Sequence, residues 1–565
     1  VENHFCSKCG AWLGQLGMEP TPELYIKHLV DTFDIVKRKL KHEGTCFVNI
    51  GDTYATHTGK RSDQFGTDIN AEINSVFTKN RPKVYKVPEK CLCLIPERFA
   101  WEMIQHKTIA PHDCIGSNIF VHTSRNDVVR VVPRDNEAVN EVWISDRDRF
   151  SYEGVNSEDR LTAPMVKHNG EWKQTDWDTA MGLASDKIKA ILEDEEQGAD
   201  KLAALVSPGS TLEELYLAQK LMRAMGSGNI DHRLRQSDFS DQDAAPVMPW
   251  LGRNIEELEN LDAALLIGSN VRKEQPMISH RLRKAVMNNE AKISFINPRA
   301  CEFNFPVASN IAVAQQHLAN ELALIAAAAY KTSKNAMAAH LKKTLTGLKP
   351  TVEHKAIVSQ LKSGKNSTVL LGNFASMHPN YSALRTLAEA IATETGSVLG
   401  YLTEGANTAG AWLAGAVPHR AAAGVSADVP QGYHAGELAN QSPSAVILLN
   451  VEPDFDCVHV VQDTLKQAEM VVAISAFDSA SLRETADVLL PAAAFTETSG
   501  TFTNAEGFSQ SFKGACSPKG EARPAWKIIR VFANLLNQDG FDYMSSEEVY
   551  AEVRGLCEAI EVNNE

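Results

Sequence analysis

Long apolar runs are missing from this 565-residue sequence. The most apolar stretch, Leu322 to Tyr330, is far shorter than the roughly 20 residues with which a helix crosses a bilayer. The chain also opens without the basic and then apolar segment of an export signal. We therefore expect any association with a membrane to depend on partner proteins.

Excess positive charge is missing as well. The chain carries 56 Lys and Arg residues against 71 Asp and Glu residues, a formal net charge of −15. This balance disfavours nonspecific attraction to phosphate backbones or anionic lipid, so no nucleic-acid partner is expected. The 10 cysteines are scattered, which favours a reducing compartment over a disulfide framework.

Familiar catalytic patterns are also absent from the longer, C-terminal part of the chain. No complete G-x-G-x-x-G turn follows any of its predicted strands. Its histidines are dispersed, with no pair at ligand or triad spacing. Those considered are His112, His122, His232, His378, His419, His434 and His459. We therefore predict no catalytic residue and no metal site from these patterns.

What is present is an ordinary globular composition, 44% hydrophobic and 22% charged, in a chain long enough for several units. About the first hundred residues differ from the rest in their cysteine pairs and in their pattern of predicted helices and strands. Their apolar periodicity predicts a helix from Pro22, ended by Gly44, and then a buried strand over Thr45–Ile50. A second helix is predicted over Pro96–Gln105. These elements indicate a separate α/β module.

Paired cysteines are the other feature of this first module. Cys6-x-x-Cys9 is either half of a four-ligand zinc site or two unpaired thiols, and Cys91-x-Cys93 lacks the usual ligand spacing. Three blocks resemble the middle of DNA N4-cytosine/N6-adenine methyltransferases: CSKCGAWLGQLGMEPTPELYIKHLVDTF, FVNIGDTYA and KCLCLIPERFAWEMIQ, within about residues 4–105. The DPPY-type motif and the Gly-rich turn that this family uses for chemistry do not occur. The resemblance thus implies a truncated, inactive fragment, joined to an unrelated gene.

The long remainder alternates strands and helices. Asn118–Thr123 and Asp127–Pro133, joined by a short turn, predict a β-hairpin, and a helix follows Trp177. A unit of apolar strand, small-residue loop and amphipathic helix then recurs. Its strands are Leu202–Val206, Ala263–Ile267, Lys292–Ile296, Thr368–Leu371, Ala445–Leu449 and Val471–Ser475. Such continuous apolar strands predict two doubly wound parallel sheets covered on both faces.

Ligands of doubly wound sheets bind beyond the carboxyl ends of the strands. Three loops of this kind stand out: Gly268-Ser269-Asn270, Gly372-Asn373 and Asn450-Val-Glu-Pro453. Either they line a dinucleotide-sized cleft or their small residues simply make tight turns. The helix that follows the first strand begins at Leu212 with a capping box, Ser210/Glu213 or Thr211/Glu214.

A resemblance covers about residues 108–550. The segment HDCIGSNIFVHTSRNDVVRVVPRDNEAVNEVWISDRDRFSYEGVNSEDRLTAPMVK resembles the molybdopterin-oxidoreductase-like region of the G subunit of NADH-quinone oxidoreductase, the large peripheral subunit of complex I. It continues through GSGNIDHRLRQSDF, LIGSNVRKEQPMISHRLRKA, ISFINPR, GNFASMHPNYSALRTLAE and LPAAAFTETSGTFTNAEG. The wider family holds a bis-molybdopterin guanine dinucleotide between two doubly wound subdomains and a [4Fe-4S] cluster in a small first domain. The large peripheral subunit of complex I generally carries no molybdenum.

The chain departs from the wider family at the cofactor positions. Only Cys114 remains in the small domain, although a cubane cluster needs four cysteines, and Ser145-Asp146 stand near a later ligand position. Ser237 falls near the molybdenum-ligand position, and Phe508 replaces the usual Arg after NAEG, which weakens a grip on pyrophosphate. We expect no cofactor in this chain: neither molybdopterin nor a cluster, with iron–sulfur clusters and FMN elsewhere in the assembled complex.

The resemblance implies a vestigial cleft and a mainly structural subunit. The candidate cleft residues are Gly268, Ser269, Asn270, Gly372, Asn373, Glu497 and Asn504, the last two within a Glu497–Gly507 loop that is an interface or a vestigial cofactor loop. Asp146–Arg149 is expected to form surface ion pairs. The implied partners are the other hydrophilic subunits of complex I, including the flavin-binding subunit, at the cytoplasmic side of the plasma membrane.

Two other functions compete with this interpretation. A formate-dehydrogenase-like molybdopterin oxidoreductase is opposed by the missing cluster cysteines, and an active DNA methyltransferase is opposed by its missing motifs. The expected domains are a methyltransferase-like fragment at 1–106, a small cluster-free β domain at 107–165 and a molybdopterin-oxidoreductase-like α/β region at 166–565. The isolated chain is not expected to be catalytic.

Overall fold

A computed structural model describes most of the chain after residue 104. The described residues are 22–39, 105–194, 198–331, 333, 337–560 and 563–564. Contacts divide the chain into two units, Val1–His106 and Lys107–Glu565. In the first unit, helix α1 (Pro22–Lys39) confirms the predicted helix. The predicted strand over 45–50, the cysteine pairs and nearly all of the predicted helix over 96–105 lie outside the described residues, but Gln105 belongs to a strand.

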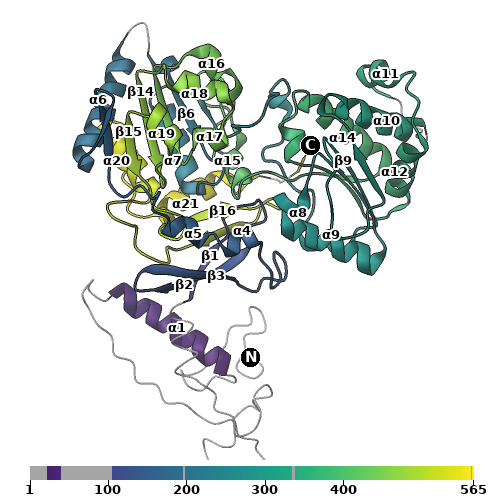
Figure 1. Cartoon of the computed structure of the whole chain (residues 1–565), viewed down its shortest axis with the longest axis horizontal. Coiled ribbons are helices and arrows are strands. Elements are labelled where there is room, and N and C mark those ends of the chain that lie inside the picture. The colour runs from purple at the N-terminus through teal and green to yellow at the C-terminus, as the bar shows by residue number, and fades with distance from the viewer. Residues whose placement is uncertain are drawn as a thin grey trace, which may run out of the picture. The chain divides into compact units, whose positions relative to one another are not determined.

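A small sheet of three strands opens the second unit (Figure 1). Its strands are β1 (Gln105–Ile109), β2 (Asn118–Ser124) and β3 (Asp127–Pro133), in that order. Arg125 and Asn126 both have positive φ, 52° and 73°, which gives a tight two-residue turn whose twist suits a hairpin. The hairpin prediction is confirmed. Two short helices follow, α4 (Asp146–Arg149) and α5 (Tyr152–Asn156).

The larger sheet has seven strands in the order β5-β4-β15-β14-β13-β6-β7. They are β4 (Met165–His168), β5 (Glu171–Gln174), β6 (Leu202–Val206), β7 (Ile230–Asp231), β13 (Ala445–Leu449), β14 (Met470–Ser475) and β15 (Val488–Pro491). The last five of these run parallel, and β4 and β5 add an antiparallel edge. The strands predicted around Leu202, Ala445 and Val471 are thus confirmed.

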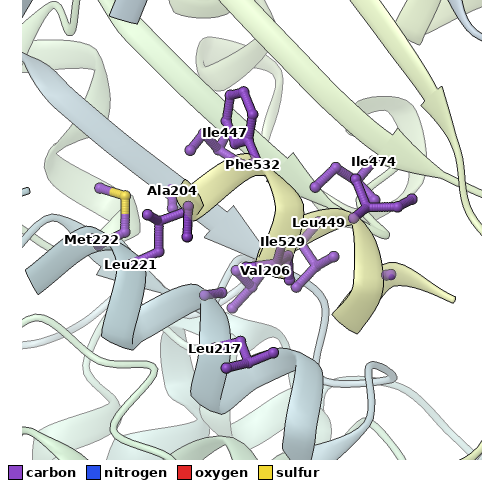
Figure 2. Close-up of a cluster of buried hydrophobic side chains, with 14 of the residues drawn as sticks. Ala204, Val206, Leu217, Leu221, Met222, Ile447, Leu449, Ile474, Ile529 and Phe532 are labelled. Carbon is purple, nitrogen blue, oxygen red and sulfur yellow. The ribbon is translucent and has the colours of Figure 1, made fainter. Parts of the chain in front are cut away.

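Helices cover both faces of this sheet (Figure 1). On one side lie α6 (Trp177–Glu193), α7 (Leu212–Ala224), α20 (Ala525–Leu535) and α21 (Ser546–Cys557). On the other side lie α16 (Leu438–Gln441), α18 (His459–Leu465) and α19 (Ala480–Thr485). Along β6, Ala204 and Val206 pack on the first side while Ala203 and Leu205 pack on the second, so the whole strand is apolar. Figure 2 shows the first side, where Phe532 of α20 and Leu221 of α7 meet the sheet.

The second sheet has five parallel strands in the order β10-β9-β8-β11-β12. They are β8 (Ala263–Ile267), β9 (Lys292–Asn297), β10 (Ser309–Ala312), β11 (Ser367–Leu371) and β12 (Val398–Tyr401). One face carries α10 (Leu318–Lys331), α11 (Ala339–Leu345), α12 (Val352–Ser363), α13 (Asn373–Ser376) and α14 (Tyr381–Thr395). The other carries α8 (Val271–Glu274) and α9 (Pro276–Asn289).

The longest apolar run of the sequence lies in α10, where it packs into this second core. Within the described residues, no helix has the length and apolar character that a membrane span requires.

Together, the sheets and their covering helices form two doubly wound subdomains and a small β-rich domain, as the sequence predicts.

The second subdomain is inserted into the first. Strands β4 to β7 precede it along the chain, and β13 to β15 follow it and complete the first sheet. Helix α15 (Thr408–Leu413) leads back from the insertion, and α17 (Pro453–Asp456) follows β13. A two-stranded sheet, β16 (Gly500–Thr503) with β17 (Ser509–Phe512), comes after β15.

Candidate functional site

Two of the predicted cleft loops meet at the carboxyl ends of β8 and β11. The Gly372 N–H donates to the Ile267 carbonyl at 2.9 Å, and the Phe374 N–H donates to the Gly268 carbonyl at 2.8 Å. A Cβ on Gly372 would lie 2.4 Å from Cβ of Ser269, so only glycine permits this approach. The structure thus brings Gly268, Ser269, Gly372 and Asn373 together, with backbone filling the space between the loops.

The close approach predicts a strong effect of a single methyl group. We expect Gly372→Ala to lower the free energy of unfolding by roughly 1–3 kcal/mol, because the methyl group would meet backbone as well as side chain. Gly182→Ala is the matched control. Gly182 lies within α6 and a Cβ there meets nothing within 4 Å, so alanine should stabilise by roughly 0.5–1 kcal/mol. Urea unfolding of both variants checks this, and equal midpoints would contradict it.

The loop after β8 is also tied to its neighbours. The Ser269 N–H donates to Asn297 Oδ1 at 2.7 Å, and Asn297 Nδ2 returns a bond to the Ser269 carbonyl at 3.0 Å. The Asn270 N–H donates to Glu274 Oε2 at 3.1 Å. These bonds hold the loop rigidly against β9 and α8.

Glu497 and Asn504 lie elsewhere. The Glu497 carboxylate accepts from Arg160 Nη2 at 2.6 Å and from Arg160 Nη1 at 3.1 Å, and both side chains are 1% exposed. Asn504 Nδ2 donates to the Ile115 carbonyl at 3.0 Å, so it anchors the β16–β17 turn to the small domain. The candidate residues therefore occupy three separate places. Their assignment to a vestigial cofactor cleft stays a prediction.

A cavity of about 100 Å³, here called the inter-sheet cavity, lies between the two subdomains. It is lined by residues 232–236 after β7, by Tyr401 at the end of β12 with residues 402–404 after it, and by residues of α14 and α15. Of the predicted cleft residues, Gly372 lines this cavity. Sequence reasoning missed the rest of the lining, because it comes from segments far apart in the chain. Ser237, the residue near the family's metal-ligand position, is exposed and is not among its lining residues.

Arg233 is the most embedded cation of the inter-sheet cavity. It forms a two-pronged pair with Asp231 at 2.8 and 2.9 Å and a bond to Gln242 Oε1 at 3.1 Å. Its guanidinium lies 4.7 Å from the ring centre of Phe239 and 5.3 Å from that of Trp412. Burial alone would raise the pKa of Asp231, but the Arg233 charge holds that pKa below its ordinary value.

A second, larger cavity of about 310 Å³ lies at the carboxyl ends of β6, β13 and β14, and we call it the hairpin-side cavity. Its lining includes His112 of the small domain and Asn450 after β13. Helix α7 begins here with a capping box between Thr211 and Glu214, so the second of the two predicted boxes is confirmed.

The N-terminus of α7 is where a pyrophosphate would bind in a doubly wound fold. Two buried carboxyl groups of the chain lie at this helix start. Glu214 accepts from the Thr211 N–H at 3.0 Å, and Glu213 accepts from the N–H and hydroxyl of Thr501 at 2.9 and 2.8 Å. Burial raises the pKa of both glutamates to about 7. These residues do not fit a pyrophosphate, because two buried carboxyl groups, which carry negative charge when ionised, lie where its phosphates would sit.

Sequence reasoning also missed a polar network beside the hairpin-side cavity. His112 Nδ1 lies 2.8 Å from Asp148 Oδ1, and Ser145 Oγ donates to Asp148 Oδ2 at 2.7 Å. Asp148 is fully buried, so the prediction of surface ion pairs over 146–149 is wrong for this residue. Burial, and then the nearby charge of Asp148, raise the pKa of Asp113 to about 7. The sequence alone does not predict the contact between His112 and Asp148, because the two residues are 36 positions apart.

The small domain does not fit a cubane iron–sulfur cluster. Cys114 is its only cysteine, is 1% exposed, and has a pKa raised to about 12, chiefly by burial. Clusters are held by thiolates, usually four. In the part of the chain that the structure describes, no group of three His, Cys, Asp or Glu residues could hold a metal ion.

Two family models match consecutive parts of the chain. Residues 105–153 match the model described as "NADH-ubiquinone oxidoreductase NDSU1/NuoG-like, 4Fe-4S domain". Residues 160–535 match "Molybdopterin oxidoreductase". An iron–sulfur domain is thus present in this family, in contrast to our expectation of a chain without cofactors. The methyltransferase resemblance of about residues 4–105 gains no support from these matches and stays a prediction.

Relatives point the same way. The chain is 28% identical over 485 residues to the mitochondrial NADH-ubiquinone oxidoreductase 78 kDa subunit of Candida albicans, covering 85% of this chain and 59% of that one. It is 26% identical over 450 residues to the G subunit of NADH-quinone oxidoreductase from Rickettsia conorii, covering 80% and 58%. The chain therefore spans about three fifths of the length of these relatives.

A solved structure shows the same fold. Acetylene hydratase from Pelobacter acetylenicus superposes with a TM-score of 0.56 at 13% identity, covering 79% of this chain and 71% of that one. This likeness concerns the fold alone. Because the molybdopterin oxidoreductase model matches well over half of its residues, the chain belongs to the molybdopterin oxidoreductase family.

Proposed function

We propose that the chain is part of the large peripheral subunit of an NADH:quinone oxidoreductase, respiratory complex I. The observation that carries this proposal is the order of the two family matches, an NDSU1/NuoG-like domain at 105–153 followed by a molybdopterin oxidoreductase region at 160–535. Relatives with subunit names from that complex support it. The assembled complex would transfer electrons from NADH to quinone.

Within that complex the chain acts as a scaffold. The carboxyl groups at the start of α7 and the closed Gly268 and Gly372 loops speak against a molybdopterin dinucleotide, and a single buried cysteine speaks against a cluster at 105–153. Iron–sulfur clusters and FMN would then belong to other parts of the complex. The partners are the other hydrophilic subunits, including the flavin-binding one, and the chain attaches to the cytoplasmic side of the membrane through them.

The test is purification of the natively expressed, tagged chain from its own cells. We expect the flavin-binding subunit and NADH oxidation to co-purify with it. Glu-specific digestion followed by mass spectrometry should yield the peptide Met103–Glu137, which joins the proposed domain 1–106 to the proposed domain 107–165. If the purified chain brings down no flavin-binding subunit, the proposal is contradicted. If peptides after Glu137 are abundant but the joining peptide is absent, residues 1–106 belong to another gene.

The metal content of the chain distinguishes the scaffold role from the alternative function, a molybdopterin-dependent oxidoreductase. If the chain is a molybdopterin-dependent oxidoreductase, as its family membership and fold allow, the chain freed of its partners contains stoichiometric molybdenum. The scaffold role instead predicts less than stoichiometric molybdenum and iron in the freed chain, measured by inductively coupled plasma mass spectrometry. The iron content of the intact complex is the reference: a lower iron content in the freed chain shows that the separation removed the clusters of the partner subunits.

A further inference from the structure

The hairpin-side cavity has an aromatic lining and the volume of a ligand pocket. Four phenylalanines line it: Phe477, Phe495, Phe502 and Phe512. Phe502 and Phe512 are almost fully buried, whereas Phe477 and Phe495 are half-buried. The cavity of about 310 Å³ matches the smaller of the clefts, roughly 300–1,000 Å³, that hold small molecules in proteins. The half-buried rings therefore offer apolar surface to an occupant of this cavity.

The lining contains carboxyl groups without a matching positive charge. Glu214 and Glu452 belong to it, and among the described residues that line the cavity none is lysine or arginine. Arg160 lies 5.8 Å from the ring centre of Phe477, but it does not line the cavity and is already paired with Glu497. Carboxylates that no lysine or arginine neutralises repel anions and attract cations. The charge of the lining therefore favours a positively charged occupant.

Glu452 is the carboxyl group of this lining that lacks a partner. It is half-buried, and its N–H donates to Asp456 Oδ2 at 2.8 Å. Its own carboxyl group forms no hydrogen bond or ion pair with any residue that the structure describes. Burial raises the pKa of Glu452, and the charges of Asp456, Asp454 and Asp159 raise it further. A bound positive charge would offset this repulsion and supply the missing partner.

We propose that the hairpin-side cavity binds a small organic ammonium ion, with Glu452 as its counter-charge and Phe477 and Phe495 as its aromatic contacts. The face of an aromatic ring attracts a cation, and a ring also packs against the carbon groups around an ammonium nitrogen. A metal ion suits the cavity less well, because the described residues contain no group of three that could hold one. This binding is independent of electron transfer and goes beyond the scaffold role.

The test compares choline with its uncharged analogue, the alcohol in which a carbon atom replaces the nitrogen. The two probes have the same shape, so only the charge differs. Isothermal titration calorimetry of the full chain at constant ionic strength should show choline binding at least about 10-fold more tightly. Hydrogen exchange should show choline protecting residues 450–452 and 475–478. Equal affinities, no binding of choline, or protection confined to other segments would overturn the proposal.

A variant adds a second line of evidence. Glu452→Gln keeps the shape of the side chain but removes its charge, so it should weaken choline binding by at least about 10-fold and leave the affinity for the alcohol unchanged. Asp463→Asn, at an exposed carboxyl group of α18 that does not line the cavity, should leave both affinities unchanged. If Glu452→Gln fails to fold, the ratio of the two affinities in the unaltered chain decides the question. Unaltered choline affinity in a folded Glu452→Gln chain would refute the assignment.

Discussion

Replacing Glu497 with alanine should lower the free energy of unfolding by roughly 3–5 kcal/mol. The substitution leaves the Arg160 guanidinium buried without its counter-charge, and both side chains are 1% exposed. It also removes the acceptor of the Ala494 N–H, which donates to Glu497 Oε2 at 2.9 Å. Urea unfolding at pH 7, followed by circular dichroism, measures the loss as a lower midpoint.

An exposed ion pair provides the matched control. Lys187 and Glu469 lie 2.6 Å apart with side chains 38% and 43% exposed. Solvent screens such a pair, so Glu469→Ala should cost only about 0–1 kcal/mol. A loss for Glu497→Ala no larger than for Glu469→Ala would mean that the buried pair is not needed for the fold. In that case, the loop between β15 and β16 would again be a candidate interface.

Glu213→Gln should make the unfolding free energy fall less as the pH rises from about 5 to 8, while Glu214 and Asp113, whose pKa values are also raised to about 7, keep their own contributions. Burial raises the pKa of Glu213 from 4.5 to about 7 in the folded chain, which therefore holds its proton more tightly than the unfolded chain does. The stabilisation is complete below pH 4.5 and is lost as the pH passes through 7. The lost part amounts to roughly 2–3 kcal/mol for this one carboxyl.

Urea midpoints at several pH values measure this dependence in the natural chain and in the Glu213→Gln variant. A glutamine side chain can still accept from the Thr501 N–H, so the variant should fold. Glu484→Gln is the control. A hydrogen bond from Lys466 lowers the pKa of Glu484, so its titration lies below the pH window and its loss should leave the slope intact. Equal slopes in the natural and Glu213→Gln chains would show that Glu213 is ionised throughout.

Strands buried on both faces could be predicted because each is a continuous apolar run between turn residues. The run at Leu202–Val206 is an example, and its bounds match the structure. Strand β12 (Val398–Tyr401) escaped prediction, since its first two residues are exposed or half-buried and Gly400 interrupts it. Gly400 is required there because a Cβ would lie 2.0 Å from the Leu251 carbonyl oxygen. Contacts of that kind are decided by tertiary packing, which local sequence does not contain.

In the candidate site as well, one part could be predicted from the sequence and another could not. Small residues after β8 and β11 indicated loops at a common edge of a sheet, and the structure brings these loops together. Partners of single side chains could not be foreseen. Arg160 and Glu497 are 337 residues apart, and His112 and Asp148 are 36 apart. Only folding brings such residues into contact.

The inserted subdomain has a consequence for synthesis on the ribosome. Strand β6 emerges early, yet its neighbour β13 is made only after the whole second subdomain. The five-stranded sheet can complete its pairing from one uninterrupted stretch, whereas half of the larger sheet must wait with an unpaired edge. During that interval β6 and its apolar side chains are open to other chains. The larger sheet is therefore where a nascent chain most needs protection by a chaperone.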